Sequence, residues 1–161
     1  KDGIDPDETN GHIDGVATYV APGEVACIWT DDESHPYYQV ARDAYETLSN
    51  AVDAKGRKLK IHKLCMGANP IALDEEAAAT IDMVETAKER TTDYEVMGSY
   101  LNFLIVNGGV IVPQYDDPND ALAIEQIQAM FPDREIVGVN TTQILYGGGN
   151  IHCITQQEPK A

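Results

Sequence analysis

The sequence is short of positive charge. Its 161 residues include 11 Lys and Arg against 27 Asp and Glu, which gives a formal net charge of −16. Nucleic acids and anionic membranes are bound mainly through Lys and Arg, so neither is an expected partner. The acidity favours a cationic ligand, because a cleft of one sign concentrates the opposite charge. Acidity also keeps a protein in solution, so the charge permits a cationic partner without proving one.

Long apolar runs, a secretory leader and paired cysteines are also absent from the sequence. No run approaches the ~20 apolar residues of a membrane-spanning helix, and no basic and apolar leader opens the sequence. The first residue is Lys1 rather than methionine, and we expect the chain to be a piece of a longer polypeptide. The three cysteines cannot all pair within the chain, and none lies in a C-x-x-C motif. This pattern favours a reducing, cytoplasmic compartment.

The composition is otherwise that of a globular protein, with 43% hydrophobic and 24% charged residues, and we expect residues 1–161 to form one domain. Residues 23–32 align with residues 108–117, each segment starting at a glycine and ending in an Asp-Asp pair. An apolar segment precedes each glycine, over 16–20 in the first copy and 101–106 in the second. Each copy therefore predicts two strands joined by a tight turn.

A helix and a further strand are predicted after each Asp-Asp pair. In the second copy, Asp117 suits the N-cap of a helix that Pro118 begins and Pro132 ends. The first helix is predicted from one apolar stripe of Val40, Ala44 and Leu48, with Ala41 and Tyr45 beside them. The second is predicted from Ile124, Ile127 and Phe131, which share one face. The strands that follow are expected at residues 59–64 and 135–139.

The predicted unit is β-β-α-β, present twice, with a partial third unit that ends in the segment around Cys153. The fold class is therefore expected to be α/β with about two to three repeat units. Such repetition gives either a stacked array or a pseudo-symmetric ring, and the pattern does not choose between them. Between the copies, residues 77–88 have a helix-forming composition. Breaks at 91–93 and Gly98 leave a short helix or an ordered loop as the expectation.

Cys153 is the strongest candidate nucleophile. It follows three glycines at 147–149 and lies in a short segment predicted as a strand, and glycines let the backbone turn tightly and let a ligand approach. Cys27 lies within an apolar strand and Cys65 follows another, so both are expected to be inert. A structural role in a core strand is the competing interpretation for Cys153.

His12 and Asp14 are the other candidate site residues. They are two positions apart in a segment predicted as a strand, so both side chains are expected on one face. A carboxylate can orient an imidazole, or hold a cation while the imidazole acts as a base beside it. The simpler interpretation is a hydrogen-bonded histidine at a solvated strand end.

A metal centre is a weaker prediction. His152 and Cys153 are adjacent, so in a strand they would face opposite sides and could not share one metal. A zinc site needs about four convergent ligands, and His12, Asp14 and Cys153 supply three. The fourth would be left to His35, His62 or water. We therefore expect neither a metal nor a cofactor.

Five segments of the sequence together resemble one enzyme family. They are residues 9–14 (TNGHID), 54–58 (AKGRK), 99–103 (SYLNF), 110–120 (VIVPQYDDPND) and 147–157 (GGGNIHCITQQ). On this resemblance the chain is identified as the C-terminal half of an agmatine deiminase, within the guanidino-modifying pentein superfamily. The resemblance implies a pentein-type α/β propeller, which is built of five β-β-α-β units.

The resemblance also implies a role for each candidate residue. Cys153 would attack the guanidinium carbon of agmatine, His12 would be the general acid and base, and Asp14 would pair with the guanidinium N–H groups. The product of this hydrolase would be N-carbamoylputrescine, formed through a covalent thiouronium intermediate on a route to putrescine and other polyamines. A dicationic substrate also suits the net charge.

The family binds the guanidinium through a further Asp and Glu, which come from an N-terminal half that this sequence lacks. We therefore expect little or no deiminase activity from this polypeptide alone. The alternatives are a peptidyl-arginine or arginine deiminase relative, for which no dedicated Arg clamp is evident, and a non-catalytic pentein module. A homo-oligomer is compatible with the sequence.

Overall fold

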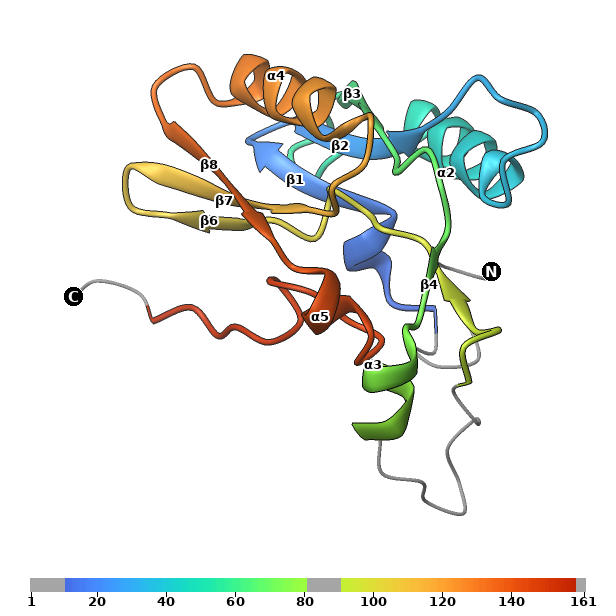
Figure 1. Ribbon diagram of the computed structural model, residues 1–161. Coiled ribbons are helices and arrows are strands. Elements are labelled where there is room, and N and C mark those ends of the chain that lie inside the picture. The colour runs from blue at the N-terminus through green and yellow to red at the C-terminus, as the bar shows by residue number, and fades with distance from the viewer. Residues whose placement is uncertain (1–10, 81–90, 159–161) are drawn as a thin grey trace.

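The structure of the protein is a computed structural model that describes residues 11–80 and 91–158 (Figure 1). In the first part of the chain, strands β1 (Ala17–Ala21) and β2 (Glu24–Trp29) form an antiparallel hairpin. Helix α2 (Tyr38–Ser49) then leads to β3 (Lys60–Cys65), which pairs with β2 in parallel. The sheet order is β1-β2-β3.

The second sheet has the same order of elements and strand directions. Strands β6 (Leu104–Val106) and β7 (Gly109–Gln114) are antiparallel, and helix α4 (Asp120–Met130) leads to β8 (Glu135–Asn140), which is parallel to β7. The remaining elements are short: η1 (Ile13–Gly15), β4 (Ile71–Ala72), α3 (Glu75–Thr80), β5 (Glu95–Val96) and α5 (Thr142–Leu145). Of the helix considered over 77–88, residues up to Thr80 belong to α3, and 81–90 lie outside the described residues.

Both predicted hairpin turns are present, and glycine is the physical reason for each. Gly23 has φ +84° and Gly108 has φ +82°, and these two glycines align with one another in the sequence. A side chain is strained at such angles, so glycine at each position permits the turn. Hydrogen bonds from Lys60 N to Gly23 O and from Glu135 N to Gly108 O then tie the third strand to each turn.

The start of α4 differs from the prediction. The helix begins at Asp120 rather than Pro118, because the carboxylate of Asp117 accepts hydrogen bonds from Ala68 N at 2.9 Å and from Asn119 N at 2.8 Å. Asp117 therefore joins the loop after β3 to the loop before α4. The expected end is present, since α4 stops at Met130, two residues before the proline.

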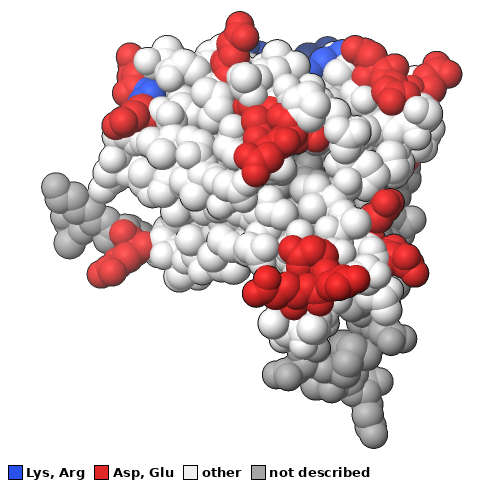
Figure 2. Space-filling view, in the orientation of Figure 1, with Lys and Arg blue, Asp and Glu red and all other residues white. Residues whose placement is uncertain are grey.

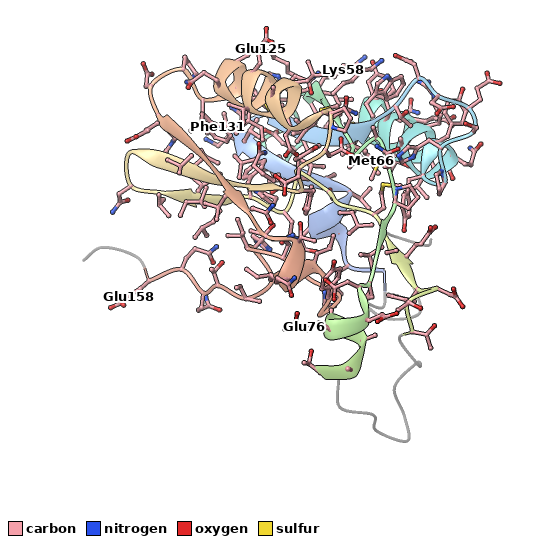
Figure 3. The ribbon with its side chains drawn as sticks, viewed as in Figure 1. Lys58, Met66, Glu76, Glu125, Phe131 and Glu158 are labelled. Carbon is pink, nitrogen blue, oxygen red and sulfur yellow. The ribbon has the colours of Figure 1, made fainter. Side chains whose placement is uncertain are left out.

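The two long helices pack differently. α2 contacts β2 and β3 of its own sheet, whereas α4 contacts β8 of its own sheet and β3 of the other. Ala123 and Ile127 of α4 are fully buried, whereas the buried residue of α2 is Ala41. A hydrogen bond from Cys65 N to Gln126 Oε1, at 2.8 Å, links α4 to the end of β3. α4 thus joins the two sheets into one core (Phe131, just after α4, is labelled in Figure 3).

Three predicted strands are wrong in whole or in part. The segment around His12 and Asp14 forms the 3-10 turn η1, residues 151–154 form a turn, and the strand expected over 101–106 is limited to β6. In the first two places the backbone bonds within a turn, as from Val16 N to Ile13 O at 2.8 Å. Within the described part of the chain, no helix is both long and apolar enough to cross a membrane.

Candidate active site

A small cavity of about 60 Å³ lies where the two ends of the described chain meet. Figure 1 shows the segment before β1 beside the segment that contains α5. The lining residues that matter for chemistry are His12, Asp14, Asn102, Tyr115 and Cys153. The structure thus brings all three predicted site residues to one cavity. Among the described residues that line it, Asp14 is the only acid.

Asp14 is in direct contact with the cysteine segment. Its Oδ2 atom accepts a hydrogen bond from Cys153 Sγ at 3.2 Å and another from His152 Nδ1 at 2.9 Å. The prediction that His152 and Cys153 face opposite sides is therefore wrong. That geometry holds for a strand, whereas a turn lets adjacent side chains reach the same carboxylate.

Asn102 explains why the cysteine segment is a turn. Its Oδ1 atom accepts hydrogen bonds from His152 N at 3.0 Å and from Cys153 N at 3.4 Å, and these backbone groups are not paired with a neighbouring strand. The Asn102 side-chain amide donates to Cys153 Sγ at 3.2 Å. A Cβ atom on Gly149 would lie 2.9 Å from Cys153 Cβ, so only glycine fits beside the cysteine.

The electrostatics of the site keep the sulfur protonated. Partial desolvation of the sulfur raises the pKa of the Cys153 thiol, and the hydrogen bond and negative charge of Asp14 raise it further. Burial opposes ionisation of Asp14, but hydrogen bonds from Cys153 and His152 outweigh it and lower the pKa of Asp14. At neutral pH the resting pair is therefore a thiol beside a carboxylate.

A buried chain of hydrogen bonds holds the two halves of the site together. Ser99 Oγ donates to Gly15 O at 2.7 Å, next to Asp14. Tyr115 Oη donates to Ser99 O at 3.2 Å and accepts from Asn150 Nδ2 at 3.0 Å, three residues before the cysteine. Burial raises the pKa of Tyr115, so the hydroxyl keeps its proton for this donation.

His12 reaches the cavity from the residue before η1 and has an exposed side chain. Two further histidines have partners away from this cavity: His35 Nε2 lies 3.2 Å from Gly67 O, and His62 Nε2 lies 2.7 Å from Glu24 Oε2. Among residues 11–80 and 91–158, no group of three or more His, Cys, Asp or Glu side chains is arranged to hold a metal ion.

Of the remaining thiols, Cys27 is buried and Cys65 is half-buried. Burial raises the pKa of Cys27 to about 11 and that of Cys65 to about 12. Sequence reasoning missed Asn102 and His152 as parts of the site. Asn102 lies in a segment that carried the family resemblance, which was its one signal. His152 was discounted because a strand was assumed.

Comparison with known proteins identifies the class. Residues 1–159 match the sequence profile of the Porphyromonas-type peptidyl-arginine deiminases, and the chain belongs to this family. A candidate agmatine deiminase of Streptococcus mutans is 63% identical over 159 residues, which are 99% of this chain and 42% of the relative. The agmatine deiminase of Pseudomonas fluorescens is 49% identical over 158 residues, covering 98% of this chain and 43% of the relative. The resemblance seen in the sequence is thereby confirmed.

Solved structures give the same result. The structure of Enterococcus faecalis agmatine deiminase, described as catalysing its reaction, superposes with a TM-score of 0.92 at 57% identity. That match covers 99% of this chain and 43% of the other. The chain therefore has the mixed α/β fold of these deiminases and spans less than half the length of the relatives it matches.

Proposed function

We propose that this chain is the cysteine-bearing part of an amidine hydrolase that converts agmatine to N-carbamoylputrescine and ammonia. The observation that carries the proposal is the 3.2 Å contact between Cys153 Sγ and Asp14 Oδ2, in a cavity that His12 also lines. A guanidinium presents a planar fork of N–H donors that matches a carboxylate. Pairing with Asp14 would bring its central carbon close to the sulfur.

The raised pKa of Cys153 fits a reaction that begins when the substrate binds. A guanidinium beside Asp14 and Cys153 supplies positive charge, which favours the thiolate. The thiol proton passes to His12 and the thiolate attacks the guanidinium carbon, so a C–S bond forms and the C=N π pair moves to nitrogen. His12 protonates a departing nitrogen, ammonia leaves, and a thiouronium remains. His12 then deprotonates a water that attacks the same carbon, and the C–S bond breaks to release the ureido product.

Agmatine is the favoured substrate because the two relatives described above, which are named as agmatine deiminases, are 63% and 49% identical to this chain. The family name points to peptidyl-arginine as the second candidate. The net charge of −16 suits a dication, and Figure 2 shows several separate acidic patches on one face, with few Lys and Arg side chains.

We also propose that residues 1–161 form one domain, the C-terminal part of a pentein-type propeller with about two to three units. The shared order of elements in the two sheets supports this proposal. Asp14 is the only acid among the described lining residues, so the guanidinium clamp is incomplete and the chain alone is expected to yield little or no ureido product from agmatine. The free cysteines fit a cytoplasmic location.

A pair of electrophiles tests the site on this chain as it stands. Chloroacetamidine is a planar cation and chloroacetamide is its neutral analogue; both alkylate a thiolate with loss of chloride. We expect the amidine-to-amide rate ratio at Cys153 to exceed that of free cysteine by about tenfold, because Asp14 attracts the cation. Mass spectrometry of the Cys153 peptide measures both rates.

The Asp14→Asn variant should lose this preference, and Asp31→Asn, an acid on another surface, should keep it. Equal ratios for Cys153 and free cysteine, or an unchanged preference in Asp14→Asn, would contradict a cation site beside the sulfur. Assaying agmatine and an N-acylarginine after co-expression with the unmatched portion of the Streptococcus mutans relative then decides between the two substrates.

A further inference from the structure

His152 contacts the active site but has no role in the proposed reaction. Its ring nitrogen Nδ1 lies 2.9 Å from Oδ2 of Asp14, the acid that the proposed function assigns to the guanidinium. Asp14 lines the cavity and His152 is not among the described lining residues, so the ring meets the carboxylate from outside the cavity. The His152 side chain is 45% exposed, so apolar packing does not account for this contact.

The backbone of His152 is held on both sides. Its N–H group donates to Oδ1 of Asn102 at 3.0 Å and to the backbone oxygen of Asn102 at 3.2 Å. Its carbonyl oxygen accepts from Thr155 N at 3.2 Å and from Thr155 Oγ1 at 3.1 Å. The ring therefore extends from a fixed point of the turn, and the hydrogen bond to Asp14 sets the two torsions of its side chain.

The partner of the ring decides which nitrogen carries the proton. Burial opposes ionisation of Asp14, but the hydrogen bonds from Cys153 and His152 outweigh it and lower the pKa of Asp14, so the carboxylate is ionised at neutral pH. An ionised carboxylate only accepts hydrogen bonds. Nδ1 of His152 is therefore the donor in this pair.

Asp14 has little local support. It lies in the short 3-10 turn η1, of which no residue is buried. The two hydrogen bonds to its Oδ2 atom come from His152 and Cys153, which are 138 and 139 positions away. The thiol bond is temporary, because a thiolate has no proton to donate. Of these two donors, His152 alone keeps its bond to Asp14 after the sulfur ionises.

We propose that His152 is a positioning residue, whose Nδ1–H group holds the Asp14 carboxylate in the orientation that receives the guanidinium. This inference rests on the proposed function. When Cys153 loses its proton, two anions face each other across the 3.2 Å contact. The N–H group of His152 draws the negative charge of Oδ2 toward itself and keeps the carboxylate from turning away from the thiolate. The bound cation then meets both anions already in place.

The ratio of amidine to amide alkylation tests this role. The rates of chloroacetamidine and chloroacetamide at Cys153 are measured at pH 8 for the wild type, His152→Leu and His152→Asn. His152→Leu removes the donor, and the ratio should fall at least about threefold because the carboxylate is no longer held. His152→Asn should stay within about twofold of the wild type, because Asn Nδ2 is as many bonds from Cα as His Nδ1 and can donate to the same oxygen. A packing role would give the reverse order, since Leu supplies more apolar bulk than Asn.

His62→Leu is the matched control. His62 forms another imidazole–carboxylate pair, with Nε2 2.7 Å from Glu24 Oε2, and neither residue is among the described residues that line the cavity; its ratio should equal that of the wild type. Carbon-13 NMR of the carboxyl groups, assigned with Asp14→Asn, gives a second measurement. The pKa of Asp14 should rise in His152→Leu, because a hydrogen bond that lowers it is removed. Circular dichroism checks that each variant is folded.

Three results would overturn the inference: a ratio in His152→Leu that equals or exceeds that of the wild type, a ratio in His152→Asn as low as in His152→Leu, or an Asp14 titration that His152→Leu leaves unchanged. The two proposals can fail separately. A wild-type ratio no higher than that of free cysteine would count against the cation site itself and so against both. A ratio that falls in Asp14→Asn but not in His152→Leu would overturn the positioning role alone.

Discussion

Two cavities of this protein each contain a cysteine, a histidine, an asparagine and at least one acidic residue, yet their chemistry is expected to differ. The larger, about 320 Å³, lies at the ends of β2 and β3 and includes Cys65, His35 and Asn119. The smaller, about 60 Å³, contains Cys153 and His12 with Asn102. Size and composition alone would favour the larger cavity.

The polar groups of the larger cavity are occupied by the fold. His35 accepts a hydrogen bond from Tyr37 N at 3.1 Å on one ring nitrogen and contacts Gly67 O with the other. Asp31 pairs with Arg42 at 3.1 Å. Burial raises the pKa of Cys65 to about 12, and the negative charge of Asp117 adds to the shift. These groups hold loops together and keep the thiol protonated.

In the smaller cavity the polar groups contact the sulfur itself. Asp14 accepts from Cys153 Sγ, and Asn102 donates to it. The carboxylate opposes the thiolate and the amide favours it, so a cation bound to Asp14 can change the balance. The difference predicts that the hydrogen-bond partners of a thiol, rather than the size of its cavity, decide which cysteine is the more reactive.

The largest expected difference is in alkylation by iodoacetamide at pH 8. With a pKa of about 12, Cys65 is thiolate in only about one molecule in 10⁴ at this pH. Cys153 is exposed, so we expect it to react on the order of 100-fold faster than Cys65. Peptide mass spectrometry measures both rates, with Cys153→Ser and Cys65→Ser identifying the sites. Similar rates would remove the contrast between the two cavities.

The next largest effect concerns the hydrogen bonds that support the smaller cavity. Tyr115→Phe removes the hydrogen-bond partner of the buried Asn150 Nδ2, whereas Ser99 O still accepts from Asn102 N at 3.3 Å. An unsatisfied buried group of this kind costs about 1–3 kcal/mol. We expect the free energy of unfolding, measured by denaturant titration, to fall by that amount. Tyr19→Phe, at an exposed position, is the control and should change it by less than about 0.5 kcal/mol. Equal stabilities would show that the network does not support the site.

Asn102→Asp makes the surroundings of the sulfur more negative while keeping the shape of the side chain. The thiolate loses a donor and gains a nearby like charge, so the pKa of Cys153 should rise and alkylation at pH 8 should slow by about tenfold. Asn119→Asp is the matched change in the larger cavity and should leave Cys153 unaffected. Faster alkylation of Cys153 in Asn102→Asp would contradict the assignment of the Asn102 amide as a hydrogen-bond donor to the sulfur.

The smallest expected effect is a pH dependence of stability from Asp14. Its pKa is lowered in the fold, so its stabilising contribution is present above the unfolded value of about 3.9 and is lost as the pH falls through the lower folded value. The stability difference between wild type and Asp14→Asn should therefore shrink on acidification from about pH 6 to about pH 3. A difference that grows over this range would have the wrong sign.

The hairpins and helices could be predicted because their causes are local. Gly23 and Gly108 adopt positive φ at the turns that the repeated pattern predicts, and the apolar stripes predict the two long helices. The start of α4 could not be predicted, because the Asp117 carboxylate accepts a hydrogen bond from the backbone N–H of Ala68, 49 positions away. The sequence pattern around Asp117 does not indicate such a distant partner.

The convergence of His12, Asp14 and Cys153 could be predicted from the family resemblance, but not from any pattern within the segments themselves. The turn at Cys153 depends on Asn102, which is 51 positions away, so β-propensity misled there. His152 was predicted to face away from Cys153 and was left out of the candidate site because a strand was assumed there. Residues that satisfy distant backbone groups are the ones that a local reading misses.

The contact between Asp14 and Cys153 joins positions 139 residues apart, and this span makes the sulfur a reporter of folding. Fraying of a helix end leaves both segments in place, whereas global unfolding separates them and gives every thiol the same solvent. In a denaturant titration, the disappearance of the reactivity contrast among the three cysteines should therefore follow the cooperative loss of the whole fold.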